Sequence, residues 1–392
     1  MNNNKKIYVM KKMRFIALYL PQFHPVKEND EVWGKGFTEW TNVAKARPLF
    51  KGHYQPHIPA DLGFYDLRLE QTRIDQAELA KQYGIEGFCY WYYWFGNGDK
   101  ILEMPIQEVI KSGKPDFPFC LAWANHSWTT STWTKMNSEK KSVMIKEQKY
   151  LGKEDYTKFF YEVLPAFKDH RYITVDGKPF FMIHNPEVIP DLDVFCSTWK
   201  QLAIENGLKG VYLVASCSGI SYKDSDNKHK LPDLSETGKL YDNMLNMGFD
   251  AINSKNFSRS ILKIQGKLWN FLYTAINTRL NIKYLQKYKQ ETINENLLSE
   301  FDERTNVFPS LYCCFDRSPR AGKAATVITD STPEVWKKML KKAVKLLEKR
   351  PEEYRIAILT AWNEWGEGCH LEPDQKYGRG YLEAIKEVLE ED

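Results

Sequence analysis

An apolar run of strand length, residues 354–359, leads into the stretch Thr360-Ala361-Trp362-Asn363-Glu364-Trp365-Gly366-Glu367-Gly368. The two glycines disfavour continuation as a strand or a helix, so the two glutamates should sit on a tight turn at a strand end. A pair of carboxyl groups is what cleavage of a glycosidic bond requires, and the neighbouring tryptophans offer flat apolar faces for sugar rings. The stretch therefore predicts an active site, with a solvated turn carrying incidental acids as the alternative.

Apolar runs of strand length occur eight times along the chain, at 14–20, 85–94, 118–124, 179–184, 210–217, 249–253, 308–315 and 354–362. Helical patterns accompany them at 68–83, 100–112, 154–168, 194–206, 235–247, 258–290, 333–349 and 378–391. Eight strand–helix units predict an α/β fold, a (β/α)8 TIM barrel with long βα loops and a helical insertion near 257–305. In such a barrel the chemistry gathers at the C-terminal ends of the strands.

Composition and charge reduce the number of possible functions and partners. The 392 residues fit one elaborated barrel domain over 1–392, and the formal net charge of +4, without a nucleic-acid motif, gives no reason to expect nucleic acid as a partner. Seven cysteines, most of them in apolar runs, predict a reduced, cytoplasmic protein. The run 15–20 is short and ends in Pro21, which predicts a first strand rather than a signal peptide, and we find no run of membrane-spanning length.

Polar and aromatic side chains follow several predicted strands and are candidates for sugar contacts. A lone loop histidine is more often structural, and part of the aromatic cluster 89–95 should face the helices because strand side chains alternate. The candidates are His24, Glu39, Trp40, Tyr92, Trp94, Trp123, Asn125, His126, His184, Asp316, Arg317, Asn363, Trp365 and Asp374, beside the proposed catalytic Glu364 and Glu367.

Metal and cofactor motifs are weak in this chain. His53 and His57 have metal-like spacing, but Pro56 disfavours the helix that would place them on one face. Gly96 and Gly98 lack the third glycine of a dinucleotide fingerprint. We expect no metal and no cofactor.

The segment 257–290 carries seven Lys or Arg residues and no Asp or Glu, with apolar residues at helical spacing. One interpretation is a long helix packed on the barrel with a solvated basic face. The other is a peripheral contact with an anionic membrane, such as the inner membrane, or with an anionic polymer.

Five ordered motifs make the chain resemble the WbsX-type proteins of bacterial surface-polysaccharide loci, which are related to glycoside hydrolase family 99. The resemblance covers nearly the whole length. The motifs are Tyr19-Leu20-Pro21-Gln22-Phe23-His24-Pro25, Gly36-Phe37-Thr38-Glu39-Trp40-Thr41-Asn42-Val43, His53-Tyr54-Gln55-Pro56, Ala60-Asp61-Leu62-Gly63-Phe64-Tyr65-Asp66 and Trp362-Asn363-Glu364-Trp365-Gly366-Glu367-Gly368.

The resemblance implies a glycoside-hydrolase-like catalytic barrel that acts on internal glycosidic bonds with retention. It implies that Glu364 is the base that activates the sugar's 2-hydroxyl and that Glu367 is the acid that protonates the leaving oxygen. The chain departs from the family pattern at Asn125-His126 and Phe315-Asp316-Arg317, which leaves the sugar open.

Three functions stay open at this point, all with an oligosaccharide or polysaccharide as ligand. They are a glycoside hydrolase or transglycosylase, a glycosyltransferase in O-antigen, capsule or lipopolysaccharide biosynthesis, and a non-catalytic glycan-binding barrel. The chain lacks the early glycine fingerprint of a Rossmann-like nucleotide fold, which disfavours the transferase.

Overall fold

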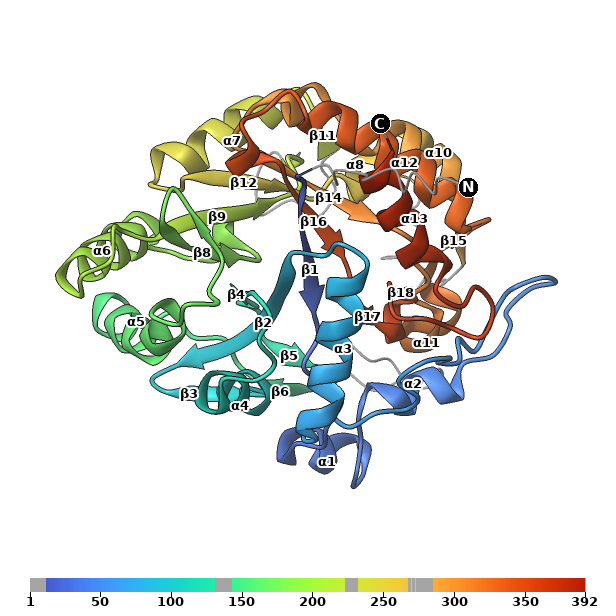
Figure 1. The fold of residues 1–392 in the computed structure, drawn as a ribbon, viewed down its shortest axis with the longest axis horizontal. Coiled ribbons are helices and arrows are strands. Elements are labelled where there is room, and N and C mark those ends of the chain that lie inside the picture. The colour runs from blue at the N-terminus through green and yellow to red at the C-terminus, as the bar shows by residue number, and fades with distance from the viewer. Residues whose placement is uncertain are drawn as a thin grey trace, which may run out of the picture.

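The computed structural model describes residues 12–130, 143–222, 232–266, 269, 272 and 285–391. Eight parallel strands form a closed barrel (Figure 1). The barrel is closed because β1 pairs with β16 on one side and with β2 on the other. These strands are β1 (Arg14–Tyr19), β2 (Gly87–Gly96), β4 (Phe119–Trp123), β8 (Lys178–Ile183), β9 (Tyr212–Cys217), β12 (Ala251–Ser254), β14 (Val307–Tyr312) and β16 (Ile356–Thr360). The eight predicted strands and the predicted TIM barrel are confirmed.

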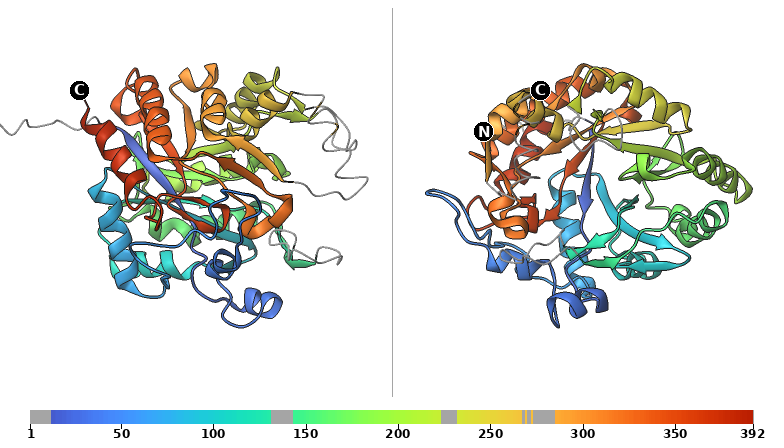
Figure 2. Two further views of the ribbon diagram at one scale, coloured as in Figure 1. Left: turned by 90° about the vertical axis from the view of Figure 1, so that its right-hand side faces the viewer. Right: turned by 180° about the vertical axis from the view of Figure 1, so that it is seen from behind.

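Helices surround the barrel on its outside, as the side and rear views in Figure 2 show. The described helices are α1 (Lys27–Trp33), α2 (Glu39–Lys45), α3 (Glu70–Gln82), α4 (Met104–Ser112), α5 (Lys153–Phe167), α6 (Leu192–Glu205), α7 (Thr237–Asn246), α8 (Phe257–Gln265), α10 (Gln290–Leu297), α11 (Ser318–Ala321), α12 (Pro333–Leu347) and α13 (Gly380–Glu390). Within the described residues, no helix is both long and apolar enough to cross a membrane.

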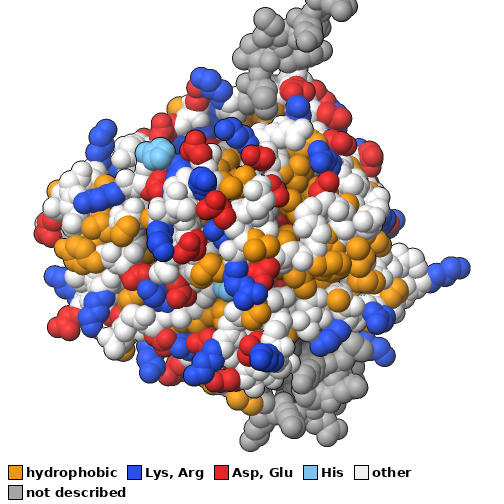
Figure 3. Space-filling model, turned by 60° about the horizontal axis from the view of Figure 1, so that its bottom comes forward, with side chains coloured by type: hydrophobic (Ala, Val, Ile, Leu, Met, Phe, Trp, Pro, Cys, Tyr) orange, Lys and Arg blue, Asp and Glu red, His pale blue; other side chains and the backbone are white. Residues whose placement is uncertain are grey.

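Short strands lie outside the barrel, most of them in the βα loops. They are β3 (Asp99–Ile101), β5 (Trp128–Thr129), β6 (Met144–Lys146), β7 (Thr174–Val175), β10 (Ser221–Tyr222), β11 (Pro232–Asp233), β13 (Gln286–Lys289), β15 (Thr326–Thr329), β17 (Asn363–Glu364) and β18 (Cys369–His370). On the outer surface, acidic and basic side chains are interspersed, in keeping with the small net charge (Figure 3).

The predicted helix over 258–290 is only partly correct. It begins as α8, but residues 286–289 form β13, which pairs in parallel with β15. Most of 267–284 lies outside the described residues, so the predicted membrane or polymer contact of 257–290 stays a prediction.

Candidate active site

The turn after β16 is shaped by close contacts with two other loops. Asn363–Glu364 pairs with β18, and three of the four residues between these strands, Trp365–Glu367, form a tight 3-10 turn. A Cβ atom at Gly366 would collide with the Glu39 carboxylate, and one at Gly368 would lie 2.8 Å from Cβ of Asp316. Glycine at both positions therefore lets the first and seventh βα loops pack against the turn.

One arginine binds three carboxylates at this turn. Arg320 belongs to α11, which follows β14, and only 7% of its side chain is exposed. Its Nη2 lies 2.9 Å from Glu39 Oε2 and 2.9 Å from Glu364 Oε2, while its Nη1 lies 2.7 Å from Glu367 Oε1. The guanidinium thus fixes Glu364 and Glu367 relative to each other, as the planar fork of arginine permits.

The buried carboxyl groups are electrostatically unequal. Burial raises the pKa of Glu364 to about 8, because the Arg320 charge only partly offsets desolvation and the charges of Glu367 and Glu39 act in the same direction as burial. Burial also raises the pKa of Glu39, against the effect of Arg320. Burial thus favours the protonated form of Glu364.

Glu364 and Glu367 line a cavity of about 520 Å³ at the C-terminal end of the barrel strands. The side chains of Trp91, Tyr93 and Trp128 give this cavity an aromatic lining. A size in this range and a mostly apolar lining with a few converging polar groups are typical of small-ligand sites.

Hydrogen-bonding side chains form another part of the cavity lining. Ser216 Oγ donates to Asn253 Oδ1 at 3.0 Å, and Asn253 Nδ2 lies 2.9 Å from Ser310 Oγ. His184 and Lys255 also line the cavity, and Lys255 Nζ donates to the His184 carbonyl at 2.8 Å. The site can therefore offer a sugar both flat apolar faces and hydroxyl partners.

Five residues proposed from the sequence lie together in this cavity. Two are the proposed catalytic residues, and the other three come from the loops after β4, β8 and β14. They are Glu364, Glu367, His126, His184 and Arg317.

Three of the proposed aromatic sugar contacts point the other way. Trp94 stacks on Phe159 of α5 with ring centroids 4.9 Å apart, and Trp123 stacks on Phe195 of α6 at 5.6 Å. The Tyr92 hydroxyl donates to Glu162 of α5 at 2.9 Å. Tyr92, Trp94 and Trp123 thus pack between barrel and helices, and the expectation that Trp123 lies at the barrel mouth is wrong.

Tyr92 and Trp94 point away from the cavity because successive side chains of a strand alternate between its two faces. In β2, Trp91 and Tyr93 face the cavity, so Tyr92 and Trp94 must face the helices. The run 90–95 is aromatic on both faces, and its sequence therefore carries no polar–apolar signal that tells one face from the other.

Six further candidates pack within the loops rather than lining the cavity. Glu39 holds Arg320, and Asn363 bonds both backbone groups of Leu20 at 2.7 and 3.0 Å. Trp365 stacks on His370, with ring centroids 3.7 Å apart. Glu39, Asn363, Trp365, His24 and Asn125 are buried and Trp40 is half-buried, so in this structure they support the loops.

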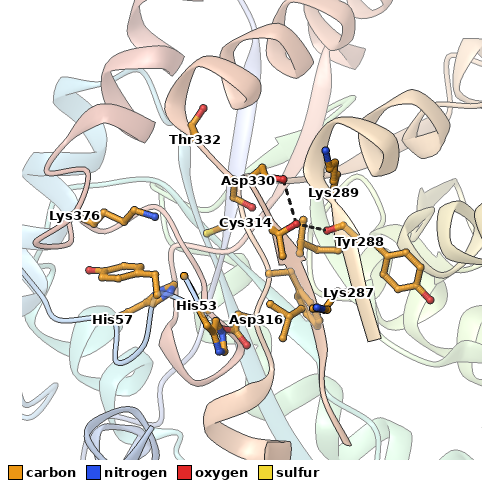
Figure 4. A pocket seen from close by; sticks show the side chains of 18 of the residues that line it. His53, His57, Lys287, Tyr288, Lys289, Cys314, Asp316, Asp330, Thr332 and Lys376 are labelled. Atoms are coloured by element: carbon orange, nitrogen blue, oxygen red, sulfur yellow. Dashed lines mark hydrogen bonds and ion pairs between the residues drawn. The ribbon is translucent and has the colours of Figure 1, made fainter. Parts of the chain in front are cut away.

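Asp316 and Asp374 line a second hollow of about 720 Å³ on the other side of the turn. Figure 4 shows Lys287, Lys289 and Lys376 among its lining side chains. Asp316 Oδ2 lies 2.7 Å from His53 Nε2 and accepts a hydrogen bond from Gln55 Nε2 at 2.5 Å. Asp316 and Asp374, both proposed from the sequence as sugar contacts, therefore lie outside the cavity that Glu364 and Glu367 line.

One buried group near this hollow has the donor atoms of a metal site. Ligand atoms of His57, His370 and Asp374 lie within 4.8 Å of one another. His370 Nδ1 donates to the Glu372 carbonyl at 2.9 Å, which leaves His370 Nε2 to accept from His57 Nδ1 at 2.9 Å. This hydrogen bond accounts for the contact between the imidazoles, and we assign no metal to the group.

Several cavity residues were not proposed from the sequence. Arg320 follows β14, but the sequence does not indicate its contact with Glu39, because this contact joins two loops that are far apart in sequence. Lys255 directly follows β12, so the rule that strand ends carry the site could have found it. To propose Trp91 and Tyr93, one would have had to know which face of β2 points into the cavity.

The family model described as "Glycosyltransferase WbsX" matches residues 15–385. The chain belongs to the WbsX family. It is 30% identical over 380 residues to the uncharacterized protein WxcX of Xanthomonas campestris pv. campestris, matched in two strains, covering 95% of this chain and 49% of the relative. The chain thus spans about half the length of these two relatives.

Solved structures show the same fold. The GH99 endo-α-mannosidase from Bacteroides thetaiotaomicron, in complex with bis-tris-propane, superposes with a TM-score of 0.53 at 12% identity over 97% of both chains. A "glycoside hydrolase-like protein" superposes with a TM-score of 0.55 at 14% identity, covering 100% of this chain and 98% of the other. The family and the fold together support a carbohydrate-active enzyme.

Proposed function

We propose that this WbsX-family chain is a retaining, endo-acting glycoside hydrolase or transglycosylase that acts on a bacterial surface polysaccharide. The observation that carries the proposal is the pair Glu364 and Glu367, which line one cavity with aromatic walls and are both bound by Arg320. The likeness to an endo-α-mannosidase fold makes an α-mannosidic or similar linkage the first to try.

In the proposed reaction, ionised Glu364 takes the proton of the sugar's 2-hydroxyl while O2 attacks the anomeric carbon. The bond from that carbon to the glycosidic oxygen breaks, and Glu367 gives its proton to the leaving oxygen. A 1,2-anhydro sugar and the shortened glycan result. Water or another sugar hydroxyl then opens the three-membered ring, Glu367 removes the proton of this acceptor, and Glu364 returns a proton to O2.

Arg320 has a positioning role in this scheme. Its guanidinium donates to both carboxylates through different nitrogens, so the two groups keep their separation while each gains and loses a proton. Glu39, which is fully buried, holds the guanidinium from behind. Preorganised charges of this kind need little rearrangement during the reaction.

A sugar-nucleotide glycosyltransferase is the second candidate, favoured by the description of the family model. The test is to incubate the purified protein with surface polysaccharide of the encoding organism, and with its lipid-linked precursor, each with and without sugar nucleotides. Shortened glycans formed without nucleotides support the hydrolase or transglycosylase. Chain extension that strictly requires a nucleotide contradicts it.

The doubly substituted variant Glu364→Gln/Glu367→Gln is the matched control for this incubation. If it still shortens the glycan, a contaminating enzyme or other residues are responsible. Binding of the glycan without any turnover by the wild-type protein would favour the non-catalytic glycan-binding barrel.

A further inference from the structure

Lys255 places a positive charge in the catalytic cavity, on a strand end different from the one that carries the glutamates. It directly follows β12, whereas Glu364 follows β16, and β14 lies between these two strands in the sheet. Its ammonium group donates to the His184 carbonyl at 2.8 Å and lies 3.5 Å from Asn185 Oδ1. The side chain is therefore anchored with its charge at the cavity wall.

This charge has no counter-ion in direct contact. In the part of the chain that the structure describes, no carboxylate forms an ion pair with Lys255. The charge of Glu187 raises the pKa of Lys255 from a distance longer than an ion pair. Burial lowers the pKa values of the neighbouring His126 and His184, and Lys255 lowers them further, so these rings are neutral at physiological pH. The nearest partners of the ammonium group are uncharged acceptors.

A partly buried cation with only neutral partners is costly unless a ligand supplies the opposite charge. The cavity of about 520 Å³ is large enough for a ligand of sugar size. A negative group on the ligand would meet Lys255 while the reacting bond lies at the glutamates. Lys255 thus adds a positive charge to the cavity apart from Arg317 and Arg320, which pair with the glutamates.

We propose that Lys255 binds an oxyanion on the glycan, the carboxylate of an acidic sugar or a phosphate substituent, and thereby selects anionic polysaccharides. This inference rests on the proposed function, because it assumes that a glycan enters this cavity. It adds the substrate class, which the two glutamates do not define.

The test measures binding of oligosaccharides released from the surface polysaccharide of the encoding organism. One sample is left untreated, a second has its carboxylates reduced to alcohols, and a third has its phosphates removed. We expect the untreated sample to bind about 10- to 100-fold more tightly than one of the two neutralised samples, which identifies the anion.

Variants connect this preference with Lys255. Lys255→Met should bind the untreated and the neutralised sample equally, whereas Lys255→Arg should keep a preference for the anion. Lys178→Met is the matched control, because Lys178 begins β8 at the opposite end of the barrel and pairs with Asp250 at 3.8 Å. It should bind like the wild type.

Three outcomes would overturn the inference. Equal binding of all three samples by the wild type would show that no anion is recognised, while the proposed function would stand. A preference that persists in Lys255→Met would place anion recognition elsewhere. If no sample binds, the proposed function fails as well, and the inference fails with it.

Discussion

The carboxylates of Glu364 and Glu367 face a cavity, whereas the carboxylate of Glu372, on the same C-terminal segment, is enclosed by protein. Glu372 accepts hydrogen bonds from Tyr65 Oη at 2.8 Å, Gln76 Nε2 at 2.7 Å and Trp365 Nε1 at 2.6 Å. It is 1% exposed. Nearby carboxyl groups on one segment therefore differ in their access to the cavity.

The electrostatics alone would not separate these two sides. Burial raises the pKa of Glu372 to about 7 and that of Glu364 to about 8. Both carboxyl groups thus look like candidate proton-transfer residues. Only access differs, because Glu364 lines the cavity and Glu372 does not. A raised pKa indicates that a carboxyl group is buried. Whether that group can contact a ligand depends on whether it lines the cavity.

The largest effect is expected on the cavity side. Glu364→Gln and Glu367→Gln should each lower turnover by about 10²- to 10⁴-fold while glycan binding and folding persist, because Gln keeps the shape but cannot exchange a proton. Steady-state kinetics on a cleaved glycan measures this. The surface variant Glu78→Gln on α3 should match the wild type.

The leaving group separates the two roles. An aryl glycoside needs little protonation of its leaving oxygen, so it should largely restore the first step in Glu367→Gln but not in Glu364→Gln. A 2-deoxy substrate should reproduce the Glu364→Gln loss. Wild-type turnover by either Gln variant, or of the 2-deoxy substrate, would contradict the assignment.

Neighbouring tryptophans of β2 give a second contrast between the two faces. Trp94→Ala should lower the free energy of unfolding by about 3–5 kcal/mol, because its ring is buried against Phe159. Trp91→Ala should weaken glycan binding with a smaller loss of stability, since Trp91 lines the cavity. Denaturant unfolding and glycan titration measure the two effects. Equal stability losses, or weaker binding in Trp94→Ala alone, would contradict the assigned faces.

The barrel could be predicted from the sequence because each strand is a compact apolar run that a helical pattern follows. The turn that carries Glu364 and Glu367 could be predicted because both glycines interrupt regular structure. The sequence could not predict which side chains of the aromatic strand β2 face the cavity, because both of its faces are aromatic. It could not predict the contact of Arg320 with Glu39 either, because this contact joins the first and seventh βα loops. The strand β13 was missed because its residues continue a helical apolar pattern.

A smaller effect is expected from Glu372→Gln. The amide keeps one acceptor oxygen but turns an N–H₂ group toward buried donors, which should cost about 1–3 kcal/mol of unfolding free energy near pH 5. The folded-state pKa of about 7 lies above the unfolded value, so the wild type loses stability as pH rises toward 7, by about 1.4 kcal/mol per pH unit.

The Gln variant has no such titration at this position, so the stability difference should narrow between pH 5 and pH 7. Denaturant titrations of both proteins across this range measure it. A difference that stays constant with pH would show that Glu372 is ionised throughout and that burial does not hold its proton.

The smallest effect is the pH dependence of turnover in the wild-type enzyme. A base must be ionised to act, and the pKa of Glu364 in the free enzyme is raised to about 8 by burial. In the proposed role, the pH profile of kcat/KM should therefore contain a titration near pH 8 that belongs to Glu364. A profile without a titration near pH 8 would contradict the raised pKa of Glu364. Tyr93→Phe serves as the control variant for this measurement, because Tyr93 lines the same cavity and interacts with the Glu364 charge. An apparent pKa near 8 that persists in Tyr93→Phe excludes the phenol as the titrating group.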